Sequence, residues 1–142
     1  MGIYRTRADQ MRFKHSTSSV TDSAAAAAML PKAMETSRQE RFVVLSLNSK
    51  HQLIGKPSVV AIGTVNMVEV HPRDVFYEAI RCNAVAIIVA HNHPSGDAEP
   101  SIDDQSLTRR LVTAGALLGI TVLDHIIVGG RSHVSLAERG LI

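Results

Sequence analysis

The stretch AVAIIVAHNHPSGDAEPSIDDQ (residues 84–105) contains an apolar run, a turn and the start of a helix. The run AVAIIVA (84–90) predicts a buried strand, because a short continuous apolar segment suits a strand that is covered on both faces. Pro94 favours an extended conformation for His93 and ends the strand. Ser101 stands directly before a helical apolar pattern, so we expect it to be the N-cap of a helix.

Strands and helices alternate on both sides of this stretch. We expect, in chain order, a helix through the alanine run that Pro31 ends, strands at 41–48 and 51–63, a helix at 71–83, the strand at 84–90, a helix at 102–118, and strands at 120–130 and 131–136. This alternation predicts an α/β fold in which a mixed sheet is flanked by helices.

The composition fits one globular domain with an aliphatic core. The chain has 142 residues, 45% of them hydrophobic, and no tryptophan. Its only cysteine is Cys82, which excludes an intramolecular disulfide and a cysteine-rich zinc site and favours a reducing, cytoplasmic compartment. No segment approaches the roughly 20 apolar residues of a membrane span, so we expect no membrane association.

Residues 1–20 are polar and predict a flexible basic arm ahead of a domain at 21–142. The first 15 residues hold four basic side chains against one acidic side chain, a net charge of +3. Such an arm predicts weak contact with nucleic acid. The alternative is a solvated terminus without a partner.

His91 and His93 stand where the strand at 84–90 ends. In an extended chain residues i and i+2 point the same way, so both imidazoles can face one point while Asn92 turns away. Strand ends of this kind are where α/β sheets place their sites. The pair therefore predicts two ligands of a metal ion. His125, in the strand at 120–130, is either a hydrogen-bonded core histidine or a partner behind these ligands.

A carboxylate is the expected third ligand. Asp104 falls at the third position of the helix that Ser101 caps, where the first turn holds it rigidly, but the same position is typical of a capping box. Asp103 is the nearest competitor, about 100° away around the helix, and the turn offers Asp97 and Glu99 as well. Two histidines and one aspartate form a set that zinc accepts with its fourth position open to water, which is typical of catalytic sites.

The spacing H-x-H-x7-S-x2-D, here His91, His93, Ser101 and Asp104, resembles the JAMM signature of JAB/MPN-domain metalloproteases. The string HNHPSGDAEPSIDD, with GTVNMVEVHPRDVFYEAI before it and LDHIIVGG after it, resembles the RadC branch over residues 40–142. The resemblance implies a JAB/MPN (cytidine-deaminase-like) architecture and one zinc ion per chain, held by the two histidines and Asp104. RadC proteins often carry an N-terminal helix-hairpin-helix region, for which this chain has no room, so a short form is expected.

The resemblance also implies two catalytic side chains. Glu40 matches the upstream glutamate that serves as general acid and base, and Ser101 can donate a hydrogen bond to a developing oxyanion. The implied enzyme is a zinc metallopeptidase or isopeptidase, in which zinc-bound water activated by Glu40 cleaves an amide bond of an unknown protein or peptide substrate. The alternative is a binding module associated with DNA repair or recombination, in which the metal site is not used for proteolysis.

Overall fold

The computed structural model describes residues 13–63 and 69–142, and all structural statements below concern these residues. Its elements are β1 (His15–Ser19), α2 (Ser23–Ala28), α3 (Ala33–Thr36), β2 (Glu40–Leu47), β3 (Gln52–Ile54), β4 (Ser58–Gly63), α4 (Pro72–Arg81), β5 (Ala86–Asn92), α5 (Ile102–Leu118), β6 (Thr121–Gly129) and β7 (Ser132–Ser135). In this part of the chain no helix has both the length and the hydropathy that crossing a bilayer requires.

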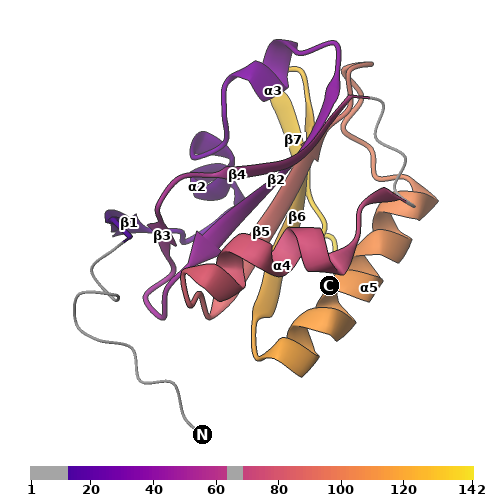
Figure 1. Ribbon diagram of the computed structural model, residues 1–142. Coiled ribbons are helices and arrows are strands. Elements are labelled where there is room, and N and C mark those ends of the chain that lie inside the picture. The colour runs from indigo at the N-terminus through magenta and orange to yellow at the C-terminus, as the bar shows by residue number, and fades with distance from the viewer. Residues whose placement is uncertain (1–12, 64–68) are drawn as a thin grey trace, which may run out of the picture.

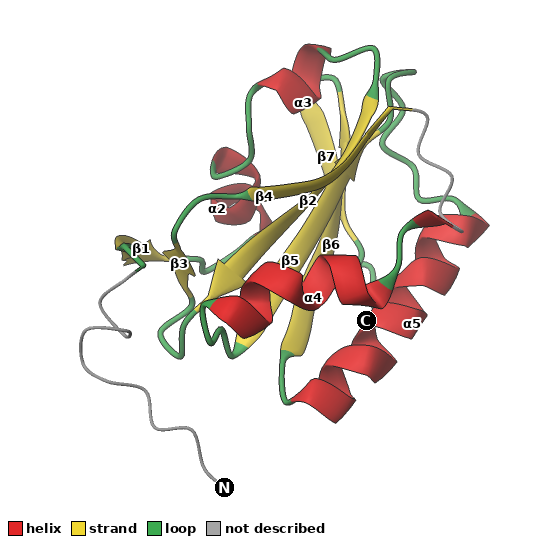
Figure 2. Ribbon diagram, viewed as in Figure 1, coloured by secondary structure: helices red, strands yellow, loops and turns green. Residues whose placement is uncertain are grey.

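The strands form one mixed sheet between two layers of helices. The strand order is β1-β3-β2-β5-β6-β7, and β4 also pairs with β2. The neighbours β5 and β6 are parallel and are connected through α5, whereas β2 and β7 run antiparallel to them. Helices α4 and α5 cover one face of the sheet, and α2 and α3 lie against the other (Figures 1 and 2). The predicted fold class is therefore confirmed.

Successive residues of the central strands pack into two different cores. One core, under α4 and α5, includes Phe42, Val44, Ile87, Val89, Leu107 and Leu111. The other, under α2 and α3, includes Ala26, Met34, Val43, Leu45, Ile88 and Ala90. Because both faces of the sheet are covered, these strands are apolar at nearly every position, which is why they were recognisable as continuous apolar runs.

Part of the segment predicted as a flexible arm, residues 1–20, forms a strand that the sequence did not indicate. Residues 15–19 form β1, which pairs antiparallel with β3, and the Val20 N–H donates to the His51 carbonyl at 2.7 Å. This strand is largely exposed and is held by backbone pairing, so no apolar period could reveal it. Residues 1–12 of the predicted arm lie outside the described residues, and contact of the arm with nucleic acid stays a prediction.

Candidate metal centre

The site lies between the end of β5 and the first turn of α5. Strand β5 extends to Asn92, two residues further than the apolar run predicts, so His91 lies within the sheet and is only 1% exposed. Its ring stacks on Phe42 of the neighbouring strand, with ring centroids 6.0 Å apart and planes 12° apart. The His93 N–H donates to the Val128 carbonyl of β6 at 2.8 Å, which holds the next segment of chain against the sheet.

Three side chains present ligand atoms to one point. The Nε2 atoms of His91 and His93 are 3.0 Å apart. Asp104 places Oδ1 3.0 Å from Nε2 of His91 and Oδ2 3.3 Å from Nε2 of His93. Ligands of one tetrahedral zinc ion lie about 3.3 Å apart when each bond is about 2.0–2.1 Å long. The donor set therefore fits a single metal ion, and among the described residues it is the one such cluster.

Asp104 joins the histidines, whereas the other three carboxylates considered are exposed and lie outside the cluster. It also completes a capping box, because its Oδ2 accepts from the Ser101 N–H at 2.7 Å and its own N–H donates to Ser101 Oγ at 3.0 Å. One carboxylate can therefore serve both predicted roles, because Oδ2 caps the helix while Oδ1 faces His91.

The surroundings of Asp104 keep its carboxyl group deprotonated, which is the form that can bind a metal. Burial acts to raise the pKa of this carboxyl, but its hydrogen bond and electrostatic interaction with His91 and its hydrogen bonds with Ser101 outweigh that effect. Together they hold the pKa of Asp104 well below its ordinary range. The side chain is therefore an anion at neutral pH, placed at the N-terminus of α5, where negative charge is favoured.

The turn that follows His93 determines which of its two ring nitrogens can bind a metal. Its Nδ1 lies 2.8 Å from the backbone carbonyl of Asp97. A carbonyl oxygen only accepts hydrogen bonds, so Nδ1 carries a proton and Nε2 is the nitrogen left to bind a metal. The side chain is 18% exposed, and this leaves the cluster with one side that reaches solvent.

His125 lies directly behind His91. It is fully buried, its Nε2 is 2.8 Å from Nδ1 of His91, and its Nδ1 is 2.6 Å from Oγ1 of Thr108. Burial, followed by the electrostatic influence of His91, lowers the pKa of His125 well below its ordinary value, so the ring is neutral. His125 is thus both a core histidine and a partner of a candidate ligand, and Thr108, which gave no signal in the sequence, lies behind it.

Glu40 begins β2 beside the site. Phe42 pairs with His91 across the two strands, and side chains two residues apart share a face, so Glu40 lies on the same face as His91. Asn92 fixes the backbone on both sides of Glu40, because its Oδ1 accepts from the Arg41 N–H at 2.7 Å and its Nδ2 donates to the Gln39 carbonyl at 3.0 Å. Glu40 is half-buried and is not one of the clustered ligand residues.

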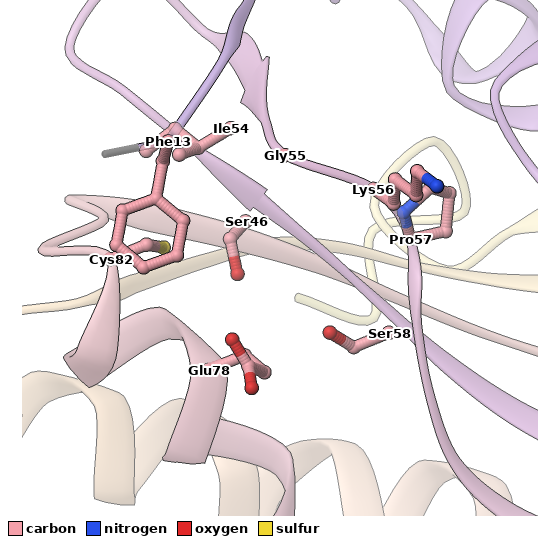
Figure 3. A pocket seen from close by; sticks show the side chains of 9 residues that line it. All are labelled: Phe13, Ser46, Ile54, Gly55, Lys56, Pro57, Ser58, Glu78 and Cys82. Carbon is pink, nitrogen blue, oxygen red and sulfur yellow. The ribbon is translucent and has the colours of Figure 1, made fainter. Parts of the chain in front are cut away.

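A hollow lies at the end of β2 opposite to the candidate metal site. Figure 3 shows Ser46, Ser58 and Glu78 around it, with Phe13 beside Cys82, and its volume is about 200 Å³. Burial raises the pKa of the Cys82 thiol, so the sulfur is protonated at neutral pH and is a poor nucleophile. This pocket shares no residue with the metal cluster.

The turn that holds His93 requires a glycine on β6. A Cβ on Gly129 would come within 2.5 Å of the Ala98 nitrogen and 2.6 Å of the Gly96 carbonyl oxygen, and both are backbone atoms. We expect Gly129→Ala to displace the turn, to cost about 1–3 kcal/mol of stability through overpacking, and to weaken metal binding, since the Asp97 carbonyl moves with the turn. Unfolding and metal titrations measure the two effects.

Gly140→Ala is the control for Gly129→Ala. Its added methyl group meets nothing within 4 Å, although the left-handed backbone at φ 72° strains an alanine there. Because Gly140 is outside the metal cluster, the metal affinity is expected to stay unchanged. Native metal affinity in Gly129→Ala would show that the turn does not position His93.

These features define an α/β domain with a candidate His-His-Asp metal site at the end of a central strand. The chain matches the family described as RadC-like JAB domain over residues 20–141 and belongs to that family. The resemblance to the RadC branch is thereby confirmed.

Curated relatives of this family are similar to most of the chain. A UPF0758 protein of Shouchella clausii is 50% identical over 115 residues, which cover 81% of this chain and 50% of that protein. A UPF0758 protein of Bacillus cereus is 52% identical over 105 residues, which cover 74% of this chain and 46% of that protein. The chain thus spans about half the length of the curated relatives it matches.

Proposed function

We propose that this protein is a zinc-dependent metallohydrolase that cleaves a peptide or isopeptide bond in a protein or peptide substrate. The observation that carries the proposal is the convergence of two Nε2 atoms and one carboxylate oxygen at spacings of 3.0 to 3.3 Å. Three protein ligands leave a coordination position open, which is the arrangement of catalytic rather than structural zinc. Imidazole donors favour zinc over magnesium or calcium.

The chemistry divides between the ion and the chain. Zinc held by His91, His93 and Asp104 would supply Lewis acidity, lowering the pKa of water to about 7 and polarising a carbonyl group. Glu40 would accept a proton from the attacking water and deliver it to the departing amine nitrogen. Its place on the face of His91, with the backbone on either side held by Asn92, supports this role.

Ser101 is suited to stabilise the oxyanion without leaving the helix cap. Its Oγ accepts from the Asp104 N–H, so the hydroxyl hydrogen remains available for donation, and the residue is exposed. A single donor aimed at a developing oxyanion typically stabilises the transition state by about 3 kcal/mol.

The test measures metal content and amide hydrolysis on the purified chain. We expect one zinc ion per chain and cleavage of peptide or isopeptide substrates that a chelator abolishes and added zinc restores. A chain that binds no zinc in chelator-free, reducing buffer would contradict the proposal at its first step. A chain that holds zinc, cleaves neither substrate class and binds DNA in a salt-dependent way would favour the binding module instead.

A further inference from the structure

We propose that Thr108 and His125 are positioning residues that fix the proton of His91 on Nδ1 and so leave its Nε2 lone pair for the metal. The inference rests on the metal site of the proposed function and not on amide hydrolysis. It is carried by a chain of three buried hydrogen bonds whose direction follows from the groups at one end.

The chain starts at a backbone carbonyl. The Thr108 hydroxyl lies 2.7 Å from the carbonyl oxygen of Asp104, one helical turn earlier. A carbonyl oxygen has no hydrogen, so Thr108 must donate its single hydrogen there. Thr108 Oγ1 can then only accept from Nδ1 of His125, which lies 2.6 Å away, and Nδ1 of His125 therefore carries a proton.

The protonation of His125 determines the direction of its hydrogen bond with His91. The two ring nitrogens of His125 contact Thr108 and His91, and the ring is completely buried. A second proton would place an uncompensated charge in this interior, which is costly. Nε2 of His125 is therefore unprotonated and accepts from Nδ1 of His91 over 2.8 Å. Nδ1 of His91 is thus occupied by a proton, which leaves Nε2, the atom that faces His93 and Asp104, as the nitrogen that can bind a metal.

The two candidate histidine ligands have different hydrogen-bond acceptors for the proton on Nδ1. His93 uses the nearby Asp97 carbonyl, whereas His91 lies inside the sheet and meets a side chain at Nδ1. Asp104 takes part at both ends of this hydrogen-bond series. Its carboxylate faces the histidines, and its backbone carbonyl accepts the hydrogen bond from Thr108. Partners of this kind set the orientation and basicity of metal-bound histidines.

The test replaces the hydroxyl of Thr108 without changing its size. In Thr108→Val, Nδ1 of His125 loses its acceptor, so the proton can move to Nε2 and reverse the bond to His91. We expect zinc affinity, measured by competition with a chromogenic chelator, to fall about 10- to 100-fold. Thr108→Ser keeps the hydroxyl and is expected to retain nearly native affinity. Thermal unfolding of the metal-free variants separates this effect from a loss of folding.

A second measurement needs no variant. Nitrogen NMR of the metal-free native chain in mildly alkaline buffer reports which nitrogen of the His125 imidazole carries the proton, and we expect Nδ1. Native zinc affinity in Thr108→Val, or a proton on Nε2 of His125 in the native chain, would overturn the inference. Neither readout uses turnover, so a failure to hydrolyse amides would leave the inference standing.

Discussion

Glu40→Gln is expected to lower the rate of amide hydrolysis by about 10²- to 10⁴-fold while leaving zinc bound, because general acid–base catalysis typically contributes a factor of this size. Glutamine keeps the length and shape of the side chain but cannot take up the proton of the attacking water. Metal content should be unaffected, since Glu40 is outside the cluster of His91, His93 and Asp104. The measurements are kcat on a peptide or isopeptide substrate and zinc per chain on the same sample.

Glu35→Gln provides the matched control. Glu35 is an exposed residue of α3, five positions before Glu40, and its replacement makes the same change of charge. We expect native turnover and native zinc content from it. Near-native turnover in Glu40→Gln would remove the acid–base role, and loss of zinc from Glu40→Gln would show that the carboxylate belongs to the ligand set.

The fold was predictable where one property governs each element. Buried strands are apolar because both faces are covered, so β2, β5 and β6 were visible as continuous runs. Helix α5 was visible because Ser101 caps it and Gly119, in the left-handed conformation at φ 73°, ends it. β1 was missed because backbone pairing with β3 holds it and leaves no trace in the side-chain pattern.

The candidate ligands were predictable because they are local. The two histidines are separated by one residue on a strand, and Asp104 is fixed by the cap of the next helix, so short-range geometry describes them all. The residues behind them depend on long-range register. His125 reaches His91 only because β5 and β6 are adjacent and parallel, and Asn92 reaches the backbone beside Glu40 only because β2 pairs with β5.

Glu40 illustrates the limit of local reasoning most clearly. Nothing in the composition distinguishes it from Glu35, and the family resemblance supplied the choice. The structure adds a physical reason that the sequence lacked: Glu40 is on the strand that stacks Phe42 on His91, and Asn92 binds the peptide groups on either side of it.

Asp104→Asn separates the two roles that meet in Asp104. Asparagine retains an oxygen that can accept the Ser101 N–H, so we expect the metal-free protein to lose only about 1 kcal/mol of stability, as for a weakened helix cap. It lacks the negative charge that balances a dication, and we expect zinc affinity to fall by more than about 100-fold, since even partners outside the ligand set cost 10- to 100-fold. Chemical unfolding without metal and zinc titration give the two values.

Asp103→Asn decides whether that loss is specific. It removes the same charge from the same first turn of α5, at an exposed position outside the ligand cluster. A general effect of charge at the helix N-terminus would weaken metal binding in both variants alike, whereas a ligand role predicts native affinity in Asp103→Asn and loss in Asp104→Asn. Native zinc affinity in Asp104→Asn would mean that this carboxylate is only a helix cap, and the two histidines would then lack the third ligand on which a catalytic zinc site depends.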